Sequence, residues 1–251
     1  MAPLIIAGEI KQQWLDFLRL LLAEFSLRYT GHIGRSVDLR DLERYELQKK
    51  VLFASIDVCS RLGVNSLVLH YELQSRDASE ETKFFEAHVA AADYAATLDI
   101  DLCIENIEVE RIEPVVDFVN RVARPNFRMC FDTGHAWLAS KYFHFDFFES
   151  LRAALPVLAH VHLSDNYGIF EELRITDRAA YDSLPKGYRM SFGRGDIHVP
   201  PFWGNIPFED VFLLLKDYSG VYVCEYASSF FLPFDAQIQQ SVRSAIDQAR
   251  S

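Results

Sequence analysis

Six apolar, strand-like runs of this sequence end on a carboxylate or an imidazole side chain. The residues at these ends are His32, His70, Glu105, Asp132, His162 and Glu225. If the strand ends meet in the fold, the acids repel one another and raise one another's pKa values. A bound divalent cation removes that conflict, because carboxylate oxygens and neutral imidazole nitrogens are its usual ligands. The pattern therefore predicts a metal site.

One of these strand ends, in the sequence CFDTGHA, carries two chemically capable residues. Asp132 closes the run and His135 follows three residues later. Each also has a structural interpretation, since an aspartate can cap a helix and a histidine can pack as an aromatic ring. In the next run, His160 and His162 point to the same side of their strand. We expect His160 to lie one layer deeper, as a core or supporting group.

Strand-like and helical segments alternate along the chain, which is typical of a parallel sheet built from βαβ units. A (β/α)8 TIM barrel fits best, with a shortened first βα unit and one irregular strand. In such a barrel all strands end on one face, where catalytic residues lie. A doubly wound open sheet is the alternative, but no glycine-rich phosphate-binding turn supports it. The seven expected strands lie within residues 4–7, 25–32, 65–70, 100–105, 127–132, 158–163 and 220–225.

Local signals set the expected ends of the helices. A helical pattern from about Asp41 to Leu62 stops at Gly63, because glycine favours the left-handed conformation that ends many helices. A helix over residues 79–98 begins with Ser79 as its expected cap and has acids in its first turn.

The composition indicates a single globular domain over residues 1–251. The formal net charge is −11, which disfavours a surface that follows nucleic-acid phosphates. No apolar run reaches the roughly 18 to 20 residues that span a bilayer, and the start of the chain lacks the basic region of a signal peptide. The four cysteines are widely spaced and are expected to be reduced and buried. We expect a cytoplasmic protein without a membrane or nucleic-acid partner.

Residues 164–206 form an unusually long connection, and such segments are often active-site lids or binding loops. Arg189 and Trp203 are its lower-ranked candidates for substrate contact, while a solvated surface excursion is the structural alternative. His198 is a further candidate whose role the sequence leaves open. Asp165 is expected to cap the loop rather than to bind a ligand.

Five short motifs, in order, resemble the xylose isomerase-like TIM-barrel superfamily. They are CIEN, CFDTGHA, HVHLSDN, GRGDI and VCEY, and the resemblance covers residues from about 27 to 226. This superfamily contains sugar epimerases and isomerases, inosose dehydratases and DNA-repair enzymes of the endonuclease IV type. The resemblance supports the barrel fold independently of periodicity.

The ketose 3-epimerase branch of that superfamily implies one divalent metal ion (Mn, Mg, Co or Zn). Its four ligand positions match Glu105, Asp132, His162 and Glu225. The histidine three residues after the aspartate, His135 here, contacts substrate in that branch. We also assign His32 and His70 to substrate binding.

The endonuclease branch implies further metals. There the counterpart of His135 binds a metal, and the counterparts of His32 and His70 join the cluster. Those enzymes also carry an Asp-x-His pair shortly before a Gly-x-Gly. In this chain Gly187 and Arg189 fall at those two positions, so the pair is expected to be missing. Together with the acidic net charge, this argues against DNA repair.

The predicted reaction is proton transfer beside a carbonyl, through an enediolate, on a small carbohydrate substrate. Glu105 and Glu225 lie on opposite sides of the substrate in this interpretation, and one removes a proton while the other returns one. Epimerisation, aldose–ketose isomerisation and elimination of water remain open. A metal-dependent phosphodiester hydrolase and a non-catalytic sugar-binding barrel are the alternatives. The aromatic-rich residues 226–234 suggest a homo-oligomer interface.

Overall fold

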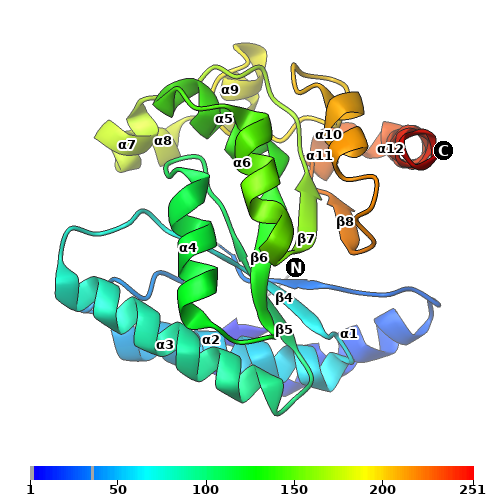
Figure 1. The fold of residues 1–251 in the computed structure, drawn as a ribbon. Coiled ribbons are helices and arrows are strands. Elements are labelled where there is room, and N and C mark those ends of the chain that lie inside the picture. The colour runs from blue at the N-terminus through cyan, green and yellow to red at the C-terminus, as the bar shows by residue number, and fades with distance from the viewer. Residues whose placement is uncertain (1–2, 35–36) are drawn as a thin grey trace. The chain divides into compact units, whose positions relative to one another are not determined.

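The computed structural model describes residues 3–34 and 37–251, which divide into two compact units (Figure 1). Unit 1 contains the described residues up to Glu105 together with Asp117–Met129. Unit 2 contains Asn106–Val116 together with Cys130–Ser251. Helix α4 (Ile112–Val122) and strand β6 (Phe127–Asp132) each contribute residues to both units.

Unit 1 is built from strands that alternate with long helices. Its complete elements are β1 (Ile5–Ile6), β2 (Glu9–Ile10), α1 (Gln12–Ala23), β3 (Gly31–His32), α2 (Tyr45–Leu62), β4 (Ser66–His70), α3 (Ala78–Ala96) and β5 (Asp101–Glu105).

The parallel strands of unit 1 follow the order β3-β4-β5, and the first half of β6 continues this order. The register of β4 and β5 pairs His70 with Glu105, so the last residues of the two strands lie side by side. His32 pairs with Val68, two residues before the end of β4. All five residues of β4 are buried, as expected for a parallel strand covered on both faces.

The predicted first strand does not belong to the parallel sheet. β1 pairs antiparallel with β2, and Ala7 and Gly8 form the two-residue turn between them. Both turn residues have positive φ, 52° and 75°, which is the geometry of a type I′ hairpin turn. Such a turn reverses the chain at once, so residues 4–7 form a hairpin instead. Over residues 3–34 and 37–251, the parallel strands are β3 to β8.

Helix ends follow the sequence signals in part, since α2 begins at Tyr45 instead of about Asp41 and α3 has a different cap. Gly63 ends α2 in the left-handed conformation, with φ of 70°, as predicted. The cap of α3 is Asp77, whereas Ser79 was expected. The Asp77 carboxylate accepts hydrogen bonds from the backbone N–H groups of Ser79 (2.7 Å) and Glu80 (3.3 Å). Asp77 thus satisfies free N–H groups of the first turn, one of them that of Ser79 itself, and α3 begins at Ala78.

An aromatic cluster forms much of the core of unit 1. The ring of Phe118 lies 5.0 Å from Phe84 and 5.9 Å from Phe127, measured between centroids. His88 is buried among these rings, and its Nδ1 lies 2.7 Å from the Phe84 carbonyl oxygen. The guanidinium of Arg40 stacks 3.6 Å from the centroid of the Phe84 ring. Burial lowers the pKa of His88 to about 4.

Unit 2 continues the alternation of strands and helices and adds several short helices. Its complete elements are α5 (Thr133–Phe143), α6 (Phe147–Ala154), η1 (Leu155–Val157), β7 (Leu158–Leu163), α7 (Leu173–Thr176), α8 (Arg178–Ser183), α9 (Lys186–Ser191), α10 (Phe208–Leu214), β8 (Val221–Cys224), α11 (Ser228–Phe231), η2 (Leu232–Phe234) and α12 (Asp235–Arg250). The second half of β6 is followed in the sheet order by β7 and β8.

The long segment between β7 and β8 is closed at its base by Asp165, as predicted. This carboxylate accepts hydrogen bonds from the backbone N–H groups of Asn166 (2.8 Å), Gly204 (2.8 Å) and Ile206 (3.1 Å). A backbone bridge also pairs Asp165 with Val199. The segment therefore folds back on the end of β7, and α7, α8 and α9 form within it.

The cysteines and the helices agree with most expectations from composition. All four cysteines are reduced; Cys59, Cys103 and Cys130 are buried, whereas Cys224 is half-buried. In the part of the chain that the structure describes, none of the helices combines the length and the apolar content needed to cross a bilayer.

His88 makes a testable contribution to pH-dependent stability. Its pKa is about 4 in the folded protein and about 6.5 when unfolded, so the unfolded chain binds the proton between these pH values. The free energy of unfolding should therefore fall as the pH drops from about 6.5 to about 4, by on the order of 3 kcal/mol. Urea unfolding across this range measures the effect.

The test variant is His88→Leu, whose side chain cannot titrate. The control is His144→Asn, because His144 is exposed and has the left-handed backbone conformation that asparagine tolerates. The leucine variant should lose most of the histidine-dependent slope and the asparagine variant little. Identical slopes in wild type and His88→Leu would contradict the assignment.

Candidate functional site

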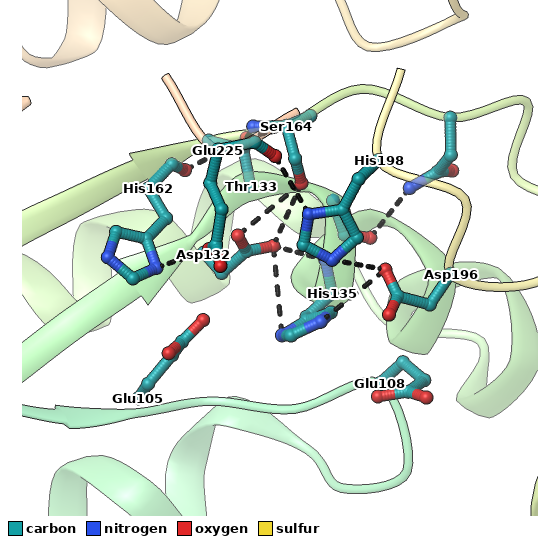
Figure 2. Close-up of polar contacts among 12 residues, drawn as sticks. Glu105, Glu108, Asp132, Thr133, His135, His162, Ser164, Asp196, His198 and Glu225 are labelled. Carbon is teal, nitrogen blue, oxygen red and sulfur yellow. Dashed lines mark hydrogen bonds and ion pairs between the residues drawn. The ribbon is translucent and has the colours of Figure 1, made fainter. Parts of the chain in front are cut away.

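Three side chains of unit 2 converge where its parallel strands end. Asp132 is the last residue of β6, His162 lies near the end of β7, and Glu225 directly follows β8. One potential ligand atom from each lies within 4.8 Å of the other two. His162 Nδ1 is 2.7 Å from Glu225 Oε2 (Figure 2). The Glu225 side chain keeps 29% of its surface exposed, while Asp132 is fully buried.

Asp132 is held by the backbone around it. Its carboxylate caps α5 by accepting a hydrogen bond from the His135 N–H at 2.7 Å. The alternative expectation that Asp132 is a helix cap is therefore also correct. The side-chain amide of Asn106 accepts from the Asp132 N–H (3.0 Å) and donates to the Asp132 carbonyl (3.1 Å). The Ser164 hydroxyl lies 3.3 Å from Oδ1 and 3.4 Å from Oδ2. The carboxylate thus has a fixed orientation at the strand end.

Gly134 is required for this close packing. A Cβ atom at this position would lie 2.2 Å from the Ser164 hydroxyl oxygen. The start of α5 therefore rests directly on the end of β7.

A second group in unit 2 combines His135, Asp196 and His198. Asp196 Oδ1 lies 3.5 Å from His135 Nε2 and 2.7 Å from His198 Nε2 (Figure 2). The two imidazole rings are 5.6 Å apart between centroids. All three residues are at least nine-tenths buried.

Backbone carbonyl groups fix the orientation of both imidazoles. His135 Nδ1 lies 2.9 Å from the Asn106 carbonyl oxygen, and His198 Nδ1 lies 2.7 Å from the Glu225 carbonyl oxygen. A carbonyl oxygen only accepts, so both rings carry a proton on Nδ1 and turn Nε2 toward Asp196. This arrangement is characteristic of metal-binding histidines, whose second nitrogen is held by a carbonyl or carboxylate.

The carboxylates also control the protonation of these rings. Burial by itself lowers the pKa of His135, but Asp132 and Asp196 together raise it well above its ordinary value. For His198, Asp196 likewise outweighs burial and raises the pKa to about 9. Positive charge is therefore favoured at this place, and either protons or a cation can supply it.

No Asp-x-His pair precedes the Gly-x-Gly of this chain, because Gly187 and Arg189 stand at those positions. Asp196 and His198 form such a pair, but they directly follow the glycines of GRG instead of preceding them. The bridge between Asp165 and Val199 brings this stretch beside the end of β7. Asp196 was not among the predicted site residues. The Asp-x-His spacing directly after GRG is the sequence signal that marks it.

Unit 1 carries a donor group of its own. Glu105 Oε2 lies 3.1 Å from His32 Nε2 and 3.5 Å from His70 Nε2. The two rings meet edge to face, 4.9 Å apart between centroids. The carboxylate of Glu105 is fully buried, whereas the His32 side chain is 32% exposed. The three predicted residues are thus together at the ends of β3, β4 and β5.

The two lower-ranked candidates in the long segment have different surroundings. Arg189 donates hydrogen bonds of 2.8 Å to the Tyr181 hydroxyl and to the Asp196 carbonyl, so it supports the second group. Trp203 packs its ring against Phe231 and Phe234, at 5.4 Å each, and is 42% exposed. Its contacts are with the C-terminal segment.

The sequence profile of the xylose isomerase-like TIM-barrel family matches residues 3–248. This chain belongs to that family. The expected TIM-barrel class is thereby confirmed, and the doubly wound alternative is dropped. No curated protein matches the chain in sequence.

Solved structures of this family share the fold at low sequence identity. A D-tagatose 3-epimerase-like protein is 20% identical, with a TM-score of 0.71 over 96% of this chain and 86% of that one. A xylose isomerase-like TIM-barrel protein from Mycobacterium smegmatis, solved with magnesium, is 16% identical, with a TM-score of 0.71 over 97% and 81%. A D-allulose 3-epimerase from Methylomonas sp., solved with D-allulose, is 19% identical, with a TM-score of 0.64 over 98% and 81%.

Substitution of Asp132 separates its capping role from its charge. Asp132→Ala removes the acceptor for the His135 N–H and should lower the free energy of unfolding by about 1–2 kcal/mol. Asp132→Asn keeps an acceptor and should lose less than half of that. Urea unfolding of metal-free protein measures both values.

Asp146 provides the control, because it caps α6 by accepting the Glu149 N–H at 2.8 Å and lies outside the groups described above. Asp146→Ala should show a similar capping loss. If Asp132→Asn destabilised the protein as much as Asp132→Ala, charge rather than the acceptor would be holding α5.

Proposed function

We propose that this protein is a divalent-metal-dependent sugar isomerase or epimerase. The observation that carries the proposal is the convergence of Asp132, His162 and Glu225 at three strand ends. Two carboxylates and one imidazole are a suitable donor set for Mn²⁺, Mg²⁺, Co²⁺ or Zn²⁺. The fixed orientation of the Asp132 carboxylate supports this assignment, since binding then needs little rearrangement.

Glu105 is the proposed fourth ligand. It ends β5, and in a TIM barrel the strand ends share one face. The residue after it, Asn106, is hydrogen-bonded to both backbone groups of Asp132. The imidazoles of His32 and His70 lie beside the Glu105 carboxylate. They are suited to hydrogen bonds with substrate hydroxyl groups.

The proposed substrate is a small carbohydrate with a carbonyl group. Similar folds include a D-allulose 3-epimerase solved with its sugar and a D-tagatose 3-epimerase-like protein. Imidazoles and carboxylates at the strand ends of this chain offer many hydrogen-bonding partners for a polyhydroxylated molecule.

A bound cation would polarise the carbonyl and stabilise the enediolate oxygen that forms during reaction. Glu225 is partly exposed at the mouth of the donor group, so its carboxylate takes the proton from the carbon beside the carbonyl. Glu105 returns a proton, either to the opposite face of the same carbon or to the adjacent carbon. His135 Nε2, held by the Asn106 carbonyl through Nδ1, orients a substrate oxygen.

Glu225→Gln tests the proton-transfer role. The amide cannot accept the proton, so we expect turnover to fall by about 10²–10⁴-fold with little change in melting temperature. Screening of ketoses, inososes and their phosphates would be followed by NMR measurement of deuterium incorporation at the reacting carbon.

Glu149→Gln is the matched control, because Glu149 lies on the surface and pairs only with Arg152 among the contacts described for it in α6. It should retain full activity. Undiminished exchange in Glu225→Gln would rule out the two-carboxylate mechanism.

A second candidate function is hydrolysis of a phosphoester by a cluster of several metal ions. His135, Asp196 and His198 favour it, because one cation with four protein ligands leaves this second donor group unused. The endonuclease IV branch carries an Asp-x-His pair with the same residue types, although there it precedes the Gly-x-Gly. The acidic net charge and the different position of this pair are the sequence arguments against that branch.

The number of bound ions separates the two candidates. A sugar isomerase should hold one ion per chain after refilling with Mn²⁺, and His198→Gln should leave that number unchanged. A hydrolase should hold two or three Zn²⁺ ions, lose one in His198→Gln, and cleave bis-p-nitrophenyl phosphate or abasic DNA. Elemental analysis of stripped and refilled protein measures the number, with the exposed His144→Gln as control.

A further inference from the structure

A third donor group in unit 2 lies in the core and includes two residues, Cys130 and His160, that have no role in the proposed reaction. Cys130 comes from β6, and His160 and His162 come from β7. Cys130 and His160 are fully buried, and His162 is 3% exposed. One ligand atom from each lies within 4.8 Å of the others. Only His162 also belongs to the strand-end group.

The geometry of this group suits a metal ion. Cys130 Sγ lies 3.5 Å from His160 Nδ1. Metal–sulfur and metal–nitrogen bonds of about 2.3 and 2.0 Å, at angles near tetrahedral, separate the two ligand atoms by roughly 3.5 Å. The rings of His160 and His162 are 4.9 Å apart between centroids and nearly perpendicular, at 87°. Their nitrogens can therefore approach one point from different directions.

The donor types decide which metal fits. One thiolate and two imidazoles form a soft set, and soft thiolate ligands select Cu⁺ over hard oxygen-preferring cations. The neighbouring group of Asp132 and Glu225 is rich in oxygen and has the opposite preference. The two groups therefore differ in chemistry although they share His162.

Charge balance points to a monovalent ion. A divalent cation with one thiolate and two neutral imidazoles would leave one net positive charge in a fully buried place, which is costly. Cu⁺ with the same ligands is neutral. We propose that Cys130, His160 and His162 form a buried binding site for a single Cu⁺ ion. This proposal does not depend on the proposed sugar chemistry.

The shared histidine also provides a route into the site. His162 Nδ1 lies 2.7 Å from the Glu225 carboxylate, whose side chain is 29% exposed. An ion can reach the core group from that side. A neutral imidazole has one nitrogen lone pair, so His162 binds an ion of one group at a time.

Competition with a copper chelator tests the site on the full chain. Under anaerobic conditions the protein is titrated with Cu⁺ against bathocuproine disulfonate. We expect one Cu⁺ per chain, and a loss of affinity of about 100-fold or more in Cys130→Ser. X-ray absorption at the copper edge should give a sulfur and nitrogen shell, with the sulfur absent in the variant.

Other thiols serve as controls. Cys103→Ser alters another buried cysteine, and Cys224→Ser alters the half-buried one; both should bind Cu⁺ like the wild type. Cys130→Ala replaces Cys130→Ser if the serine variant does not fold, as judged by circular dichroism.

The same 3.5 Å separation suits a thiol–imidazole hydrogen bond, which predicts no Cys130-dependent copper binding. Equal Cu⁺ affinity in wild type and Cys130→Ser, or a copper shell without sulfur, would overturn the proposal. Asp132→Asn should weaken Mn²⁺ binding and leave Cu⁺ binding intact, and Cys130→Ser should do the reverse. Failure of the copper site is thus distinguishable from failure of the proposed function.

Discussion

Carboxylates removed from water need compensating positive charge or hydrogen-bond donors, and this constraint organises the strand ends of the protein. Asp132 and Asp196 are almost fully buried, and each has an imidazole within 4 Å. In unit 1, Glu105 is fully buried between His32 and His70. The imidazoles compensate the acids when protonated, as the raised pKa of His198 indicates. A bound cation would supply the same compensation in place of protons, which is the physical link between this arrangement and the proposed metal site.

Backbone groups do most of the orientation. Two carbonyls hold the Nδ1 atoms of His135 and His198, and a helix N-terminus holds the Asp132 carboxylate. These contacts are made by the elements that build the sheet and its covering helices. The functional side chains are therefore held in place by rigid secondary structure. A metal or substrate site needs such fixed positions.

The long segment after β7 gives the chain its distinctive chemistry. Asp165 closes its base and the returning stretch delivers Asp196 and His198 to His135. A sugar-converting site needs one cation and a pair of acids, whereas this segment adds a complete second donor group. Whether that group binds substrate or metal distinguishes the two proposed functions, and the fold itself accommodates both.

The sequence by itself determined the class of fold and the candidates for chemistry. The repeated ending of apolar strands on His, Asp or Glu identified six of the site residues, because in parallel βα units strand ends share one edge. Gly63 and Asp165 were also readable, since each acts within its own local backbone. The Ala7–Gly8 turn, which makes a hairpin of the first predicted strand, is also local, but the strand pattern did not reveal it. Two contacts depend on tertiary structure: Asp196 meets His135 across 60 residues of chain, and Cys130 meets His160 on the neighbouring strand. Such contacts depend on how distant segments pack, and no local pattern of the sequence records that.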